Sequence, residues 1–255
     1  MDFHAARALL EWQMELGADE PIGAVPVNRY DLVAEVPKAA AVAQVAQGAV
    51  AETLDAVAAA RAAVAGIAHL DDLAEVQAGY DLCDLKKGAR NFVFADGNPA
   101  ARVMIIGEAP GRDEDLEGRP FVGRAGAMLD RMFAAIGLSR NAPDVAAALY
   151  ITNVLPWRPP SNRDPEPAEI AMMRPFLEKH VALADPDLIV LMGNTPCAAV
   201  LGQRGILRLR GRWAEGFGKP VLPMTHPAYL LRTPAAKREA WADLLELKAR
   251  LNRAG

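Results

Sequence analysis

Short apolar runs alternate with amphipathic stretches in the second half of the chain. Four such runs predict strands buried on both faces, over residues 103–106, 149–154, 188–192 and 221–224. Apolar residues recur at helical spacing over 124–137, 167–183, 195–201 and 234–252. Because strands and helices alternate, we expect an α/β fold: a three-layer α/β/α sandwich around a central, mostly parallel, four-stranded sheet.

The first 79 residues follow a different pattern. Amphipathic spacing predicts a helix over 2–18, residues 39–65 contain fourteen alanines, and a short helix is predicted over 70–76. The Ala-rich stretch is also compatible with a low-complexity linker that happens to be helix-prone. The chain is therefore divided into an Ala-rich, acidic, helical N-terminal extension over 1–79 and a second domain over 80–255.

Overall composition indicates an ordinary globular protein, whereas the distribution of charge along the chain bears on its possible partners. With 24% charged residues and no apolar run of about 20 residues, the chain is expected to be cytoplasmic, with no membrane partner. Residues 1–80 carry 4 basic and 12 acidic side chains (−8), and residues 81–255 carry 24 and 20 (+4). The net charge of −4 therefore does not exclude a nucleic-acid partner for the second domain.

Candidate chemistry follows the predicted strands, where ligands bind in α/β folds. The first strand is followed by GEAPGRDED and GRPFVG, which place carboxylates and one aromatic ring next to turn-forming glycines. The candidates in this stretch are Gly107, Glu108, Ala109, Glu114, Asp115 and Phe121. The alternative is a surface loop with solvated acids and a phenylalanine that only fills the core.

The second and third strands are followed by polar residues. Asn153 can both donate and accept, which suits the edge of a nucleobase, but it can also cap a turn. Asn194 and Thr195 open a helix, where phosphate is favoured, although a simple N-cap explains the same residues.

The fourth strand is followed by His226 and the sequence PAYLLR. A single histidine is usually structural, but a leucine on a loop can enter a base stack. Further upstream, a cluster of arginines that includes Arg210 and Arg212 flanks Trp213. This cluster could hold phosphates or form one solvated face of a hairpin.

The order of these motifs carries more information than any one of them. GEAPG…ED…GRPFVG, TNV…RPPSNR and HPAYLLR resemble the uracil-DNA glycosylase superfamily, most closely its family 4, from about Cys83 to about Leu251. The resemblance implies that residues 80–255 form a metal-free enzyme of base-excision repair. Such an enzyme flips deoxyuridine out of DNA, hydrolyses its N-glycosidic bond and leaves an abasic site. Uracil-containing DNA is the expected partner, no cofactor is expected, and the enzyme is expected to be a monomer.

The resemblance also implies a role for each candidate. Uracil stacks on Phe121 and hydrogen-bonds Asn153, while His226 stabilises the negative charge of the leaving base. Glu108 lies near the base and sugar, and Glu114 with Asp115 lies near the hydrolytic water. Gly107 and Ala109 complete the base-binding positions. The expected DNA contacts are Asn194, Thr195, Arg210, Arg212 and an intercalating residue among Leu230, Leu231 and Arg232.

The chain departs from family 4 at one point. Family members of this kind carry four cysteines that bind a 4Fe–4S cluster; Cys83 matches the second, and the other positions fall on Tyr80, Trp157 and Met173. One thiolate cannot hold four irons, so we predict no cluster. The only other cysteine, Cys197, adds neither a disulfide framework nor a four-thiolate metal site.

Two rival hypotheses remain open. A superfamily member could retain the fold and bind DNA without hydrolysing it, or a glycosylase could act on other deaminated bases such as hypoxanthine or xanthine. A generic nucleotide-binding protein is disfavoured because the sequence contains neither a phosphate loop nor a dinucleotide fingerprint.

Overall fold

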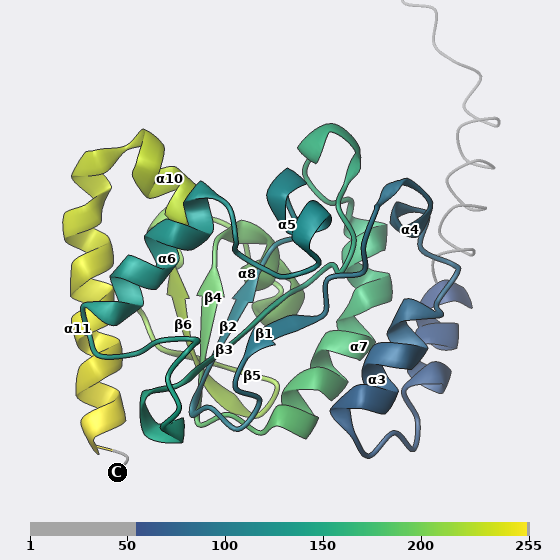
Figure 1. The fold of residues 1–255 in the computed structure, drawn as a ribbon, viewed down its shortest axis with the longest axis horizontal. Coiled ribbons are helices and arrows are strands. Elements are labelled where there is room, and N and C mark those ends of the chain that lie inside the picture. The colour runs from purple at the N-terminus through teal and green to yellow at the C-terminus, as the bar shows by residue number, and fades with distance from the viewer. Residues whose placement is uncertain (1–54, 254–255) are drawn as a thin grey trace, which may run out of the picture. The chain divides into compact units, whose positions relative to one another are not determined.

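The computed structural model describes residues 55–253, which form an α/β/α sandwich around one sheet (Figure 1). Residues 55–63 are helical, in agreement with the end of the predicted Ala-rich helix. The predicted helix over 2–18 and the rest of the Ala-rich stretch lie outside the described residues. The α/β class expected from the alternating pattern is confirmed.

The sheet has six strands in the order β1-β3-β2-β4-β6-β5. Its four inner strands are parallel: β2 (Val103–Gly107), β3 (Leu149–Asn153), β4 (Leu188–Met192) and β6 (Lys219–Met224). The two edges are the antiparallel strands β1 (Ala95–Gly97) and β5 (Ala214–Gly216). The predicted four-stranded sheet is thus corrected to six, because each edge strand has three residues and no apolar run.

Helices cover both faces of the sheet (Figure 1). One face carries α6 (Arg124–Ala134), α10 (Pro227–Arg232) and α11 (Lys237–Arg253), and the other carries α3 (Leu70–Ala78), α7 (Pro167–Ala184) and α8 (Asn194–Leu201). Shorter elements are α4 (Leu85–Gly88), α5 (Arg112–Glu117), α9 (Ile206–Leu209) and the 3-10 turns η1 (Val145–Ala147), η2 (Pro160–Asn162) and η3 (Pro234–Ala236).

Alternate residues of each central strand belong to opposite halves of the core. In β2, Val103 and Ile105 pack with α6, α10 and α11, whereas Met104 and Ile106 pack with α3, α7 and α8. All four side chains are completely buried. This two-sided burial is why the strands appear in the sequence as continuous apolar runs.

Two stretches that were expected to be loops contain helices in the structure. The stretch after the first strand contains α5, and the stretch after His226 is α10, where a loop was expected. Leu73 of α3, which precedes the predicted boundary at 79/80, is completely buried against α7. In the described part of the chain, no helix has the length and apolar character needed to cross a membrane.

Candidate active site

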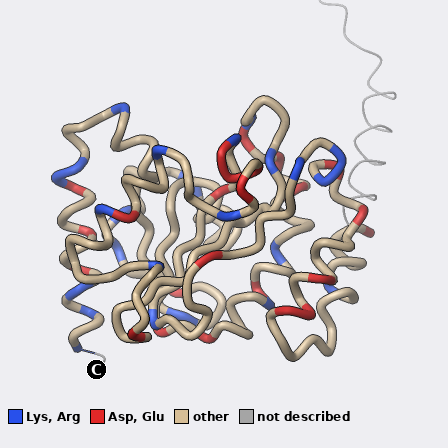
Figure 2. Tube along the Cα trace, in the orientation of Figure 1, with Lys and Arg blue, Asp and Glu red and all other residues tan. Residues whose placement is uncertain are grey.

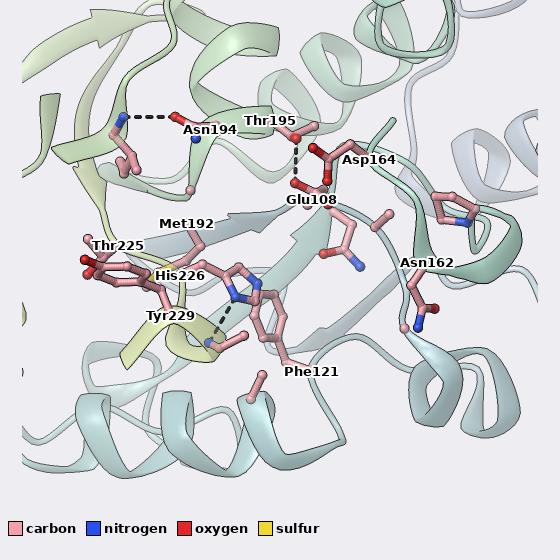
Figure 3. Close-up of a pocket in the computed structure, with 18 of the residues that line it drawn as sticks. Glu108, Phe121, Asn162, Asp164, Met192, Asn194, Thr195, Thr225, His226 and Tyr229 are labelled. Atoms are coloured by element: carbon pink, nitrogen blue, oxygen red, sulfur yellow. Dashed lines mark hydrogen bonds between the residues drawn. The ribbon is translucent and has the colours of Figure 1, made fainter. Parts of the chain in front are cut away.

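A cavity of about 1040 Å³ opens at the carboxyl ends of the four parallel strands (Figure 3). Nine of the predicted site residues line it. They are Glu108, Ala109, Glu114, Phe121, Asn153, Asn194, Thr195, His226 and Arg232. The strand ends converge there because the parallel register brings Gly107 of β2 beside Asn153 of β3.

The aromatic and amide candidates meet at the end of β2. Phe121 is 6% exposed, and its ring stacks on the imidazole of His226 with centroids 5.5 Å apart. Gly107 permits this arrangement, because a Cβ at that position would overlap both the Phe121 ring and the Asn153 Oδ1. Among the described residues, none forms a hydrogen bond with the Asn153 side-chain amide, which is therefore available to a ligand in the cavity.

His226 is held in one tautomer by the start of α10. The backbone N–H of Ala228 donates to the His226 Nδ1 at 3.1 Å, so Nδ1 accepts and the proton of the neutral ring lies on Nε2. Burial, together with the positive charge of Arg232, lowers the pKa of His226 to about 4. The imidazole is therefore neutral at physiological pH and presents one N–H donor.

Glu108 is one of the carboxylates that line the cavity. Thr195 Oγ1 donates to Glu108 Oε2 at 2.6 Å, and Asp164 lies beside these two side chains (Figure 3). Burial raises the pKa of Glu108; the Thr195 hydrogen bond opposes this effect, and the negative charge of Asp164 adds to it. Asp164 was not among the sequence candidates, because an acid after a turn with no apolar context has no distinguishing signal.

The two other predicted acids have structural partners. Both oxygens of Glu114 accept backbone N–H groups, Oε2 from Gly111 at 3.1 Å and Oε1 from Val122 and Gly123, also at 3.1 Å. Asp115 points away from the cavity: it is 6% exposed, and its Oδ1 accepts from the backbone of residues 90 and 91 at 2.8 and 3.1 Å. The expectation that Asp115 lies near a hydrolytic water is thus corrected.

The predicted phosphate contacts divide into two groups. Arg210 forms an ion pair with the buried Asp243 of α11, and Arg212 is exposed but does not line the cavity. Four other arginines line the cavity: Arg163, which forms an ion pair with Glu169, and Arg204, Arg208 and Arg232. Figure 2 shows lysine and arginine positions along many parts of the trace.

Asn194 orders the chain beside the cavity. Its Oδ1 accepts from the backbone N–H groups of Gly205 and Ile206 at 3.0 and 2.9 Å. The side chain therefore fixes the start of α9, which carries Arg208 and directly follows Arg204 and Gly205. Its contribution to the site is indirect in this structure.

The three candidates for an intercalating residue lie on the helix α10. Leu230 is completely buried in the core that α6 and α11 share, so it cannot reach a base stack, and this candidate is corrected. Leu231 is partly exposed and Arg232 is exposed at the end of the helix. The helical turn explains the difference, because consecutive residues point about 100° apart.

The comparisons with known proteins agree with this geometry. A model of the Uracil DNA glycosylase superfamily matches residues 94–245. A type-4 uracil-DNA glycosylase of Archaeoglobus fulgidus is 39% identical over 187 residues, which cover 70% of this chain and 91% of that protein. The type-4 enzymes of Saccharolobus solfataricus and Thermotoga maritima are both 36% identical, covering 72% and 68% of this chain and 87% and 90% of those proteins.

These matches define the class of protein: this α/β/α sandwich with its strand-end cavity is a DNA glycosylase, an enzyme that hydrolyses N-glycosyl bonds. The family match spans more than half of the chain, and the chain belongs to the uracil DNA glycosylase superfamily. The superfamily predicted from the motifs is thus confirmed.

The four positions that the resemblance to family 4 assigned to cluster ligands do not fit an iron–sulfur cluster. Tyr80, Cys83, Trp157 and Met173 are all less than 8% exposed and belong to one apolar cluster. Tyr80 donates its hydroxyl to the Ala56 carbonyl at 2.6 Å, and burial raises the pKa of Cys83 to about 11, so the thiol is protonated. A phenol, an indole, a thioether and one protonated thiol are not the four thiolates that such a cluster needs.

Proposed function

We propose that this enzyme releases uracil from DNA. A deoxyuridine flips into the cavity, its N-glycosidic bond is hydrolysed, and an abasic site remains. The observation that carries this proposal is the neutral imidazole of His226, which presents an Nε2–H donor in the cavity that the Phe121 ring and the Asn153 amide also line. The type-4 relatives, which carry this activity in their names, support the same substrate.

His226 would stabilise the departing base. As the bond between C1′ and N1 breaks, negative charge spreads to the uracil carbonyl oxygen. The neutral imidazole carries its proton on Nε2 and can donate it as a hydrogen bond to that oxygen. The Ala228 contact already orients this donor. The pair of electrons leaves with uracil, and the sugar acquires oxocarbenium character.

Asn153 and Phe121 would select the base. Uracil presents an N3–H donor next to an O4 acceptor, and a side-chain amide can pair with both. Cytosine presents the opposite pattern, an N3 acceptor next to an N4 amino donor. An amide oriented for uracil would therefore place its NH2 group against the cytosine amino group. The Phe121 ring provides the apolar face on which the flipped base stacks.

Glu108 is our proposal for the carboxylate that orients water. It faces the cavity, whereas the oxygens of Glu114 and Asp115 are occupied by backbone N–H groups. In its ionised form Glu108 would favour the positive sugar and accept a proton from the attacking water, whose hydroxide adds to C1′. Thr195 holds this carboxylate through its hydroxyl.

The DNA backbone would pass over the rim that carries Arg204, Arg208 and Arg232. These guanidinium groups border the cavity and can neutralise phosphates on either side of the flipped nucleotide. Leu231 and Arg232 remain as the candidates for the residue that fills the vacated space in the base stack.

A labelled oligonucleotide with a single uracil tests this proposal. Incubation with the enzyme, followed by alkali, should break the strand at uracil but not at cytosine or thymine in matched oligonucleotides. His226→Ala should remove most of the activity, whereas His69→Ala, at an exposed position on the loop before α3, should retain it. Binding without strand breakage would favour the non-hydrolytic rival, and cleavage only at hypoxanthine or xanthine would favour the other.

A further inference from the structure

Arg140 is a buried cation that neither the motifs nor the relatives assign to the site. Its side chain is 6% exposed, and it lies on the segment between α6 and β3. Nη1 donates to the carbonyl oxygen of Pro120 and Nη2 to that of Phe121, both at 2.9 Å. The planar guanidinium therefore holds two successive carbonyls of the loop that carries the stacking ring.

The same loop is held from its other side by Glu114. Oε1 of Glu114 accepts from the N–H groups of Val122 and Gly123, which directly follow the two carbonyls held by Arg140. A cation thus binds the carbonyls of residues 120–121, and an anion binds the N–H groups of residues 122–123. Four consecutive residues are fixed by two side chains of opposite charge.

The segment that Arg140 and Glu114 fix contains a residue with an unfavourable backbone conformation. Phe121 has φ of +54°, in the left-handed region that residues other than glycine rarely adopt. Such a conformation persists only where its surroundings over-determine it. Gly126 of α6 contributes as well, because a Cβ there would overlap the Phe121 carbonyl oxygen.

Arg140 is itself neutralised without losing these donors. Asp96 of the edge strand β1 accepts from Nη1 at 3.0 Å, and Asp130 of α6 accepts from Nε at 2.9 Å. A buried charge is tolerated when it is paired and hydrogen-bonded in this way. The loop is therefore tied both to the sheet edge and to α6.

We infer that Arg140 is a positioning residue for base recognition, which sets the Phe121 ring in place before a base arrives. The inference rests on the proposed function, in which the flipped uracil stacks on that ring. Without the two carbonyl contacts, the loop can relax to a negative φ, and the ring leaves the base-stacking position above β2. Because the ring is already ordered, binding of the flipped base does not include the entropy cost of immobilising the Phe121 side chain.

A double-mutant cycle tests this coupling. The variants are Arg140→Met, Phe121→Ala and the double variant, compared in single-turnover release of uracil from an oligonucleotide. Arg140→Met should lower the rate by about tenfold or more when Phe121 is present, since small displacements of positioning groups have effects of this size. In the Phe121→Ala background it should change the rate by less than about twofold, because the ring on which it acts is gone.

Three measurements distinguish positioning from general damage. Affinity for a uracil-free oligonucleotide should stay unchanged in Arg140→Met, because the rim arginines are untouched. Arg140→Lys, which keeps the charge and can hold one carbonyl, should recover part of the rate. Arg102→Met is the matched control, since its ion pair with Asp187 at 2.6 Å lies at the opposite end of β2, and its rate should equal that of the wild type.

Two outcomes would overturn the inference. One is an equal loss of rate from Arg140→Met in both backgrounds, and the other is a wild-type rate in Arg140→Met itself. If Arg140→Met does not fold, Arg140→Lys carries the same comparison with and without Phe121. The wild-type protein is assayed first. If it releases no uracil, the proposed function is refuted, and the comparison of variants does not arise.

Discussion

The proposed role of His226 depends on a neutral imidazole, which makes its pKa the most informative quantity to measure. Burial, and then the charge of Arg232, lowers this pKa from 6.5 to about 4. At about 1.4 kcal/mol for each pKa unit, the neutral form is favoured by about 3 kcal/mol over that of an exposed histidine. At pH 5, about nine-tenths of His226 should be neutral, compared with about 3% of an ordinary histidine.

The same shift predicts how stability depends on pH. The unfolded chain takes up a proton at this residue near pH 6.5, whereas the folded chain does so only near pH 4. The contribution of His226 to the free energy of unfolding should therefore decrease as the pH falls from 6.5 to 4 and stay constant below that.

Nitrogen NMR of ¹⁵N-histidine-labelled protein measures the pKa and the tautomer together. His226→Ala assigns the signal, which should show a proton on Nε2 and titrate near pH 4. In Arg232→Gln the pKa should rise but stay below 6.5, because burial is the larger of the two causes. Titration of His226 near pH 6.5 in the wild type, or a proton on Nδ1, would refute the reasoning.

Four further predictions concern other parts of the molecule. Thr195→Val removes a hydrogen bond that lowers the pKa of Glu108, so the acid limb of the single-turnover pH profile should move to higher pH; an unmoved limb would exclude Glu108 as the titrating carboxylate. Asn153→Asp should reduce uracil release by about 100-fold or more and shift preference toward cytosine, measured on paired oligonucleotides; unchanged discrimination would contradict base recognition by Asn153. His180 is buried and its pKa is lowered to about 3, so its protonation in the unfolded chain should cost about 2 kcal/mol of stability between pH 6.5 and 4.5; urea unfolding of His180→Gln should lack this loss, and identical losses would contradict that pKa. Purified protein should contain no stoichiometric iron or acid-labile sulfide, and one cluster per chain would contradict the fit of the core residues.

The parts of the fold that the sequence predicted are those with strong local patterns. The four parallel strands are buried on both faces, so each is a continuous apolar run, and α7 has helical spacing over 18 residues. The edge strands β1 and β5 have three residues each and partly exposed side chains. Their existence depends on backbone pairing with β3 and β6, which no local pattern encodes.

The site shows the same division between local and tertiary information. Ordered motifs identified Phe121, Asn153 and His226, which the structure brings to one cavity. The motifs could not separate the neighbouring acids Glu114 and Asp115, because the difference lies in their backbone partners: those of Glu114 belong to the same loop, whereas those of Asp115 lie 24 and 25 residues earlier. The two leucines of PAYLLR differ in burial because the segment is helical: Leu230 is buried and Leu231 is partly exposed. A loop, as expected from the sequence, predicts no such difference.

His226 has two functions in this structure, since it presents Nε2 to the cavity and caps the N-terminus of α10 through Nδ1. The orientation of the imidazole is therefore coupled to the position of α10, the helix that carries Leu231 and Arg232. A variant that loosens α10 from α6, far from any reacting atom, will tilt the ring through the Ala228 N–H. In an activity screen such a variant will be scored as a chemical defect, although it contacts neither the base nor the sugar.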